Sequence, residues 1–530
     1  MTGRSGVARM VKMVAAEVAE GQRGDASQVA LEAIGRSPEL ATDLLALIIK
    51  EGAKSRLSDD VLSAYGFLLG HALEQVRYAV DRMSPDGIAL ADGLRRTLLA
   101  AGVDGHINPA IMLLVLHLFA AAKLDMGDEL RDLMQAMMEA DTDARATVEP
   151  GAWSNHLADM VEELEGDVFA LHGFLEETLT AMPETMRADF ITATFAEDES
   201  ALREATIGFL CSEWSSVRFA VAELVEQSAP RGLVSPTMLR RMIGLRNWLP
   251  AEQRPALDRA IKACRQNGVE CASWPMSATG RVLATGFDGS GAHSVLVILP
   301  EGRKHAVAAM LGKLGAGVRD GWVKHGLTKA ELADIEERFS VEAFLKPTTL
   351  PYAALAARAL LGMNVAAGTM PPFGLLSFAE TVGLDSLTPE VMPTEQLIET
   401  LIEEIPMEQR GSAGIAAALS ASTLWLERHP MLESWFEDSE AVRQLLAKRG
   451  GKLKQKATLL AGPLLDRRRS WAQLVAWTAL AMKHGTDGSD WQDFAIVARE
   501  ILGERPLSGI PLMQAVADAT ISVHRGARIR

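Results

Sequence analysis

Carboxylate, imidazole and guanidinium side chains occur close together between residues 288 and 325, and such groups can act as acids, bases or anion ligands. Asp288 and His293, with serines beside them, supply the residue types of a nucleophilic triad. Asp288 also opens the segment Asp-Gly-Ser-Gly, which is typical of a tight turn. Two interpretations therefore stand: a structural turn, or an enzyme with a cleft near 288–325 whose catalytic candidates are Asp288, His293 and Arg319.

Two cations, Arg303 and Lys304, precede a glycine-containing segment at 315–321 and are candidate anion-binding residues. Backbone N–H groups of such a segment can surround an anion that neighbouring cations attract. Gly315 also fits the C-cap of a helix that we predict over 304–313. The enzyme interpretation would add three residues to the cleft: Arg303, His305 and Asp320.

Common catalytic and cofactor-binding patterns are missing from the sequence. It lacks the Walker A, Gly-x-Gly-x-x-Gly, Cys-x-x-Cys, His-Glu-x-x-His and Gly-x-Ser-x-Gly patterns. Cys264 and Cys271, with His293 and His305 downstream, match no standard zinc spacing. Three cysteines in a chain of 530 residues argue against a disulfide framework and favour a reducing compartment. We expect neither a metal nor a cofactor.

Charge is segregated along the chain, whose formal net charge is −16. Residues 121–205 contain 21 acidic and five basic residues, whereas residues 442–470 contain nine basic residues and one acidic residue. Such asymmetry concerns partners rather than fold. The candidate binding residues of the basic segment are Lys452, Lys454, Lys456, Arg467, Arg468 and Arg469.

The basic segment has three interpretations. Lysine and arginine at this density can neutralise phosphates, and Trp471 could stack on a base, which would make the protein nucleic-acid-associated. Further contacts would then come from Arg240, Arg241 and Arg246. Alternatively, the segment binds an acidic protein partner or pairs internally with the acidic residues. The third interpretation is an ordinary solvated helix surface.

Helical periodicity dominates both sides of a single interruption. Alanine, leucine, valine and methionine carry most of the apolar content, which favours helices. Residues 281–287 and 292–299 flank the tight turn and predict a β-hairpin, which must pack on helices or pair with further strands. The predicted fold class is mainly α: an irregular multi-helix array with one small β-hairpin insertion near 279–299.

A repeat-like pattern occurs at residues 199–230. A short turn at Ser215 is followed by Val217-Arg218, Ala220 and Leu224, which resembles the second helix of a HEAT repeat. The resemblance implies an α-solenoid neighbourhood, in which the apolar residues pack between helices and the arginine braces the neighbouring turn. It covers only this segment, so the array is predicted to be part HEAT-like. The predicted divisions are 1–123, 124–270, 271–345 and 346–530.

The leading functional prediction is a scaffold or adaptor rather than an enzyme. It would bind a macromolecular protein partner through an acidic face at 121–205 and a basic face at 442–470. Nucleic-acid binding through 443–471 and an enzyme cleft near 288–325 stay open as alternatives. The longest apolar run, at 110–122, is shorter than the roughly 18–20 residues of a membrane span, so we expect a cytoplasmic protein without one.

Overall fold

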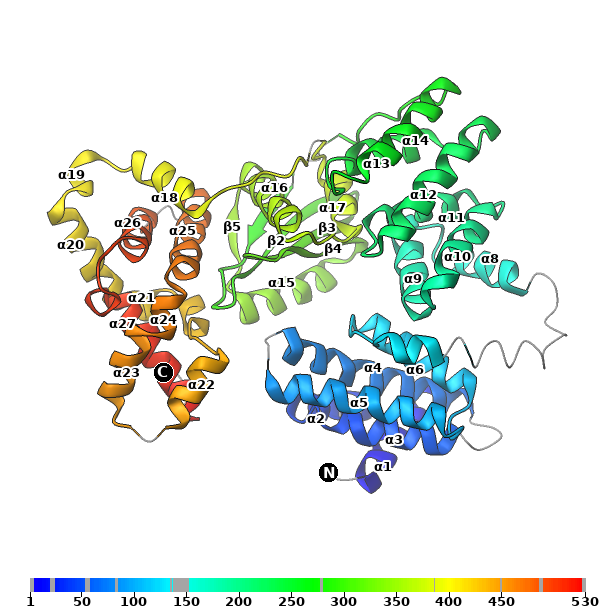
Figure 1. Ribbon diagram of the computed structural model, residues 1–530, viewed down its shortest axis with the longest axis horizontal. Helices are drawn as coiled ribbons and strands as arrows, with labels where there is room; N and C mark the ends of the chain where they lie inside the picture. Colours follow the sequence, from blue (N-terminus) through cyan, green and yellow to red (C-terminus); the bar gives the residue numbers. More distant parts are fainter. Residues whose placement is uncertain are drawn as a thin grey trace. The chain divides into compact units, whose positions relative to one another are not determined.

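A computed structural model shows that the chain forms two compact units, residues 1–209 and residues 210–530 (Figure 1). The protein is mainly α-helical with a small antiparallel sheet, which confirms the predicted fold class. The structure describes residues 4–19, 24–52, 58–81, 84–133, 136, 152–276, 280–385, 387–448, 450–485 and 490–526. Part of the acidic segment therefore lies outside the described residues.

Every secondary-structure element in the described part of the first unit is a helix. Its helices are α1 (Arg4–Ala19), α2 (Asp25–Arg36), α3 (Leu40–Gly52), α4 (Asp59–Asp81), α5 (Pro85–Val103), α6 (Pro109–Ala121), α8 (Ala152–Glu163), α9 (Val168–Ala181), α10 (Glu184–Ala196) and α11 (Ser200–Thr206). A 3-10 helix, η1 (Ile207–Cys211), follows them.

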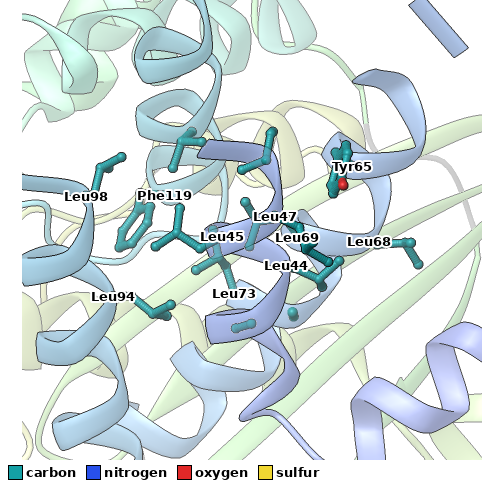
Figure 2. Close-up of a cluster of buried hydrophobic side chains, with 14 of the residues drawn as sticks. Leu44, Leu45, Leu47, Tyr65, Leu68, Leu69, Leu73, Leu94, Leu98 and Phe119 are labelled. Atoms are coloured by element: carbon teal, nitrogen blue, oxygen red, sulfur yellow. The ribbon is translucent and has the colours of Figure 1, made fainter. Parts of the chain in front are cut away.

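Helix α4 is the centre of the N-terminal core because it packs against α1, α2, α3, α5 and α6. Its buried residues recur at helical spacing, as Tyr65, Leu68, Leu69 and Leu73 show. Figure 2 shows these side chains beside leucines of α3 and α5 and Phe119 of α6. The positions of the apolar residues in the sequence therefore predict which side chains form the core of this unit.

The second unit contains the sheet between two groups of helices. The preceding helices are α12 (Ser215–Ser228), η2 (Ala229–Arg231), α13 (Pro236–Leu245) and α14 (Arg254–Gln266). The strands are β1 (Arg281–Ala284), β2 (Ala292–Glu301), β3 (Lys304–Lys313), β4 (Gly317–Leu327) and β5 (Lys346–Thr348). The helices against the sheet are α15 (Lys329–Ala343), α16 (Leu350–Ala367) and α17 (Gly374–Val382).

The remaining helices form the C-terminal part of this unit. They are α18 (Thr394–Glu403), α19 (Met407–Arg410), α20 (Ser412–Ala421), η3 (Ser422–Leu424), α21 (Trp425–Arg428), η4 (Pro430–Ser434), α22 (Glu440–Ala447), α23 (Lys452–Ala461), α24 (Pro463–Asp466), α25 (Arg468–His484), α26 (Trp491–Leu502), η5 (Leu507–Gly509) and α27 (Pro511–His524).

The predicted β-hairpin is present as β1 and β2, but it belongs to a five-stranded antiparallel sheet of order β4-β3-β2-β1-β5. The prediction of a helix over 304–313 is wrong, because these residues form β3. The apolar run from Ala306 to Met310 is buried on both faces of the sheet, so it lacks the alternation that marks a half-buried strand. Its alanines also favour a helix on propensity alone.

Helices cover both faces of the sheet (Figure 1). On one face, Leu332 of α15 packs with Leu296 and Val307. On the other face, α16 and α17 lie against β3 and β4. Among the described helices, α16 is the one long and apolar enough to cross a membrane by length and composition. Half of α16 is buried in the protein, as in a core helix, so this feature is weak evidence for a span.

Helix α12 contains the residues that resemble a HEAT repeat. Val217 is buried, and the buried Arg218 donates hydrogen bonds to the Ser212 carbonyl and to Gln253 Oε1. The arginine therefore braces the turn before its own helix. The wider solenoid stays a prediction.

Candidate ligand-binding site

Asp288 uses its carboxylate within the turn between β1 and β2. Its Oδ1 accepts hydrogen bonds from the N–H groups of Ser290 and Ala292, both at 2.8 Å, and from the Ser290 hydroxyl at 2.9 Å. The Gly289 N–H donates to Ser434 Oγ at 3.1 Å, so the turn is packed against η4. These contacts are those of the structural-turn interpretation.

His293 is buried in β2. Its ring stacks on Phe287 with centroids 4.2 Å apart, and its Nε2 lies 2.9 Å from the Tyr352 hydroxyl. Burial lowers the pKa of His293 to about 4, while a backbone hydrogen bond to Thr285 acts in the opposite direction. His293 is therefore neutral at pH 7 and sits in a packed aromatic pair.

Arg319 is exposed near the start of β4. His293 pairs with Gly312 of β3, and Gly312 pairs with Val318 of β4, so two strand spacings of about 5 Å each separate His293 from Arg319. None of the three catalytic candidates lines the cavity described below. The structure does not bring them together in that cavity.

The two candidate anion-binding cations lie at the other end of the sheet. Arg303 is in the turn between β2 and β3, and Lys304 begins β3; both are exposed. His305 pairs with Leu327, at the far end of β4 from Arg319. The ten residues of β3 extend about 30 Å, so the proposed cleft residues are spread along the sheet.

The glycine-containing segment at 315–321 forms a tight turn and the first residues of β4. A Cβ on Gly317 would lie 2.3 Å from Asn364 Oδ1, and one on Gly321 would lie 2.7 Å from the Leu375 backbone nitrogen. These glycines are therefore required by helices that approach the strand closely. Gly315, predicted as a helix C-cap, lies instead in the β3–β4 turn with φ +78°.

Most cations of the basic segment have acidic partners in the C-terminal helices. Arg469 forms two hydrogen bonds of 2.8 Å with Glu395 and lowers the pKa of that carboxyl to about 2. Arg467 Nη1 lies 2.6 Å from Oε1 of the buried Glu437. Further contacts join Lys456 to Asp518 at 2.6 Å, Lys452 to Asp518 at 3.5 Å, and Arg468 to the carbonyl oxygens of Gly503 and Arg505.

Lys454 is exposed, and Thr458 donates a hydrogen bond to its carbonyl oxygen. The arginines considered as further nucleic-acid contacts also have acidic partners. Arg240 and Arg241 bind Glu380, and Arg246 binds Asp258. To bind phosphate, most of these cations would first have to leave a carboxylate.

A cavity of about 350 Å³ lies between the sheet and the C-terminal helices. Its walls come from four stretches of chain: the end of β1 and the next residues, the end of α15 with β5, the start of η4, and the C-terminal half of α25. The lining residues are Ala284, Thr285, Gly286, Phe287, Ser340, Phe344, Leu345, Lys346, Pro347, Thr348, His429, Pro430, Met431, Thr478, Ala481, Met482 and Gly485.

Hydrogen bonds hold the walls of this cavity in place. The Trp435 indole N–H donates to the Phe287 carbonyl at 2.9 Å, and the Thr348 hydroxyl donates to the His484 carbonyl at 3.2 Å. Phe344, at the end of α15, has φ +54°, a left-handed conformation that is costly for a residue with a side chain. Such strain is a feature of ligand-binding segments, and here it sits on the cavity wall.

The lining is mostly apolar, with two phenylalanines and two methionines. Methionine side chains adapt their shape to an occupant, and cavities of this size and character are typical of small-molecule sites. Among the described residues, no group of three His, Cys, Asp or Glu side chains could hold a metal ion. The arrangement can enclose a small apolar molecule.

The sequence analysis missed this cavity. The residues from Ala284 to Phe287 belong to the predicted hairpin; the other walls come from the end of α15, from the three-residue strand β5, and from the C-terminal part of the chain beginning at His429. No motif connects those stretches. The one local signal is the turn at 288–291, whose packing on η4 brings the sheet to the C-terminal helices.

Two parts of the chain match known families. Residues 183–268 match the family described as Y4lR second domain, and residues 395–525 match the Y4lR C-terminal helical domain. A relative named "Uncharacterized protein y4lR", from Sinorhizobium fredii, is 26% identical over 465 residues, which cover 87% of this chain and 88% of the relative. No solved structure matches the chain.

These similarities cover most of the chain, and they concern neither HEAT repeats nor a described activity. The segment similar to the Y4lR C-terminal helical domain supplies the η4 and α25 walls of the cavity. The β1 and β5 walls lie outside both matched segments. The cavity is thus made where a Y4lR-like helical domain meets the sheet.

Proposed function

We propose that this protein is a helical binding protein whose C-terminal unit holds a small, mostly apolar molecule between the sheet and α25. The observation that carries the proposal is the cavity of about 350 Å³, lined mainly by apolar side chains. A well-formed apolar cavity with a few polar groups is the default ligand site of a protein. The buried free thiol of Cys264 fits the predicted reducing, cytoplasmic location.

The test of this proposal is saturable binding of a neutral apolar fluorescent probe, N-phenyl-1-naphthylamine. We expect Ser340→Trp to weaken probe binding at least tenfold, because Ser340 lies exposed on the cavity wall and an indole there would fill the space. Ala481→Phe, on the α25 wall, should act in the same way. Fluorescence titration measures both affinities.

Ala333→Trp is the matched control for Ser340→Trp, because Ala333 is exposed on the same helix and does not line the cavity. Thermal unfolding of each variant shows whether the fold is retained. Equal probe affinity in all three variants, or no saturable binding by the parent protein, would contradict the proposal.

A second proposed function retains the acidic half of the predicted scaffold. Residues 152–205 contain thirteen acidic residues and two basic ones, Arg187 and Arg203. Arg187 is buried and donates to the Met182 carbonyl, and Arg203 is bound to Glu197 and Asp198. Acidic side chains such as Asp159, Glu162 and Glu163 are exposed, and this surface would attract a basic protein partner.

We expect the triple variant Asp159→Asn, Glu162→Gln, Glu163→Gln to lose a partner that the parent protein retains in a nuclease-treated pull-down. The retained fraction should also fall as salt rises, because the attraction is electrostatic. A matched control neutralises three exposed acids of the C-terminal helices: Glu399, Glu403 and Glu408. Equal loss in both variants, or retention that does not depend on salt, would count against an acidic docking face.

Nucleic-acid binding and the enzyme interpretation stay predictions. The basic segment supports neither the scaffold nor nucleic-acid binding as strongly as expected. Most of its cations bind acidic residues of the same unit. Their role in the second unit is to join α18, α23, α25 and α27 with the segment that precedes α22.

A further inference from the structure

The region where α22 ends and α23 begins is exposed and basic, and it presents a leucine to solvent (Figure 1). The described residues among 447–454 are all exposed, and Leu453 is 85% exposed. A single exposed leucine is ordinary on a protein surface, so the cations around Leu453 decide its meaning. We call the described residues of 447–454, together with Arg525, the basic tip.

Gln455 holds the parts of the basic tip together. It is 7% exposed, and its Nε2 donates a hydrogen bond to the Lys448 carbonyl oxygen at 3.2 Å. Its Oε1 accepts a hydrogen bond from Arg525 Nη2 at 2.5 Å, and the same nitrogen lies 3.5 Å from the Gly450 carbonyl oxygen. These partners of Arg525 are neutral. The arginine that follows α27 therefore adds its charge to the tip of α22 and α23.

Cations outnumber acids around the basic tip. Asp518 of α27 lies 2.6 Å from Lys456 Nζ and 3.5 Å from Lys452 Nζ, so one carboxylate is shared by two lysines. Lys448 and Lys454 are exposed, and neither forms an ion pair with any residue that the structure describes. With the guanidinium described above, five cations lie beside this one carboxylate.

Helix α23 places Leu453 and Lys454 on its outer side. Gln455 and Leu459 are buried, whereas Leu453, Lys454 and Ala457 are exposed. An apolar side chain beside lysines matches an anionic lipid surface, because the leucine can enter the boundary between head groups and acyl chains while the ammonium groups stay among the phosphates. A nucleic acid offers phosphates but no apolar layer for an aliphatic side chain. The lipid surface therefore accounts for both features.

We propose that the basic tip docks on an anionic lipid surface, with Leu453 inserted below the head groups and Lys448, Lys454 and Arg525 facing the phosphates. The contact is peripheral and independent of the proposed ligand cavity. The chain carries a net charge of −16, which such a surface repels. Exposed charges more than about 8 Å apart are largely screened at physiological ionic strength, so the cations nearest the surface determine the attraction.

Co-sedimentation of the full-length protein with vesicles tests this inference. We expect tighter binding to phosphatidylcholine vesicles containing about one third phosphatidylserine than to phosphatidylcholine alone, and weaker binding as salt rises. Leu453→Gln should weaken binding about tenfold, because it removes the inserted apolar side chain. Lys454→Gln should weaken it about fivefold. Leu453→Trp should bind at least as tightly as the parent protein, because indoles favour the membrane interface.

Met407→Gln is the matched control for Leu453→Gln, because Met407 is 77% exposed in the same unit but lies on α19, close in sequence to Glu404 and Glu408. Lys262→Gln, on the exposed side of α14, makes the same change in net charge as Lys454→Gln. Thermal unfolding shows that each variant is folded.

Equal binding to the two kinds of vesicle, or equal losses in the variants and their controls, would overturn the lipid-docking role. The same holds if the protein does not sediment with vesicles and instead binds duplex DNA with an affinity that Leu453→Gln leaves unchanged. That result would assign the basic tip to nucleic acid.

Discussion

Replacing Glu380 with alanine is expected to lower the free energy of unfolding of residues 210–530 by about 3–5 kcal/mol. Glu380 lies on α17 and joins it to α13: its Oε1 is 2.8 Å from Arg240 Nη2, and its Oε2 is 3.0 Å from Arg241 Nη2. The three side chains are at most 12% exposed. Removing the carboxylate leaves two buried guanidinium groups without the counter-charge that Glu380 supplies.

Urea unfolding, with hydrogen exchange of peptides from α13 and α17, measures this loss. Glu395→Ala is the matched control, because Glu395 also binds an arginine in this unit but at the exposed surface, where a pair contributes about 0–1 kcal/mol. Equal small losses in the two variants would show that burial does not distinguish these pairs. Glu380→Gln should fall between them, since it keeps hydrogen-bond capacity and loses the charge.

The same ionic contact gives an expected pH dependence. Burial alone would raise the pKa of Glu380, but the guanidinium groups of Arg241 and Arg240 lower it below its ordinary value. The stabilisation is therefore fully present above the ordinary pKa of a glutamate and is lost as pH falls through the lowered pKa of the folded protein. Glu380→Gln should remove this part of the acid sensitivity.

The sequence predicts the helices well because their cores follow one periodicity. In α4 the buried residues recur every three or four positions, and the Thr328 cap with Glu331 marks the start of α15. It fails at β3, where Ala306–Met310 is buried on both faces, and at β5, which is three residues long. Neither strand shows the alternation of apolar and polar residues that predicts a strand. Each forms because its backbone pairs with neighbouring strands.

The candidate site is less predictable for a related reason. Charged residues attract notice in a sequence, yet Arg467 and Arg469 are explained by Glu437 and Glu395, which lie 30 and 74 residues away. The cavity is built mostly from apolar residues and threonines that no motif distinguishes. His429 also lines the cavity, and neither its burial nor its contact with Asp490 can be predicted from the sequence.

Gly374→Ala is expected to destabilise the second unit by at least about 3 kcal/mol, because a Cβ there would lie 1.8 Å from the Gly321 carbonyl oxygen. The added Cβ is attached directly to the backbone of α17, and the carbonyl oxygen is part of the backbone of β4. No flexible side chain can therefore move aside to relieve the contact. Relief requires α17 to leave the strand, which would also disturb the Glu380 contact with α13.

Gly244→Ala is the control for that substitution. Gly244 lies within α13, and a Cβ there would make ordinary contacts of 3.7 Å with Trp274, so alanine should be neutral or stabilise the helix by up to about 1 kcal/mol. Urea unfolding of both variants gives the comparison. A Gly374→Ala protein as stable as Gly244→Ala would mean that α17 can shift on β4 without cost.

Because β4 and β5 are opposite edges of the sheet, the folded fraction of Gly374→Ala should bind the apolar probe with the parent affinity. Lost stability with retained affinity would show that the glycine-containing segment serves the packing of the sheet, while ligand binding belongs to its other edge.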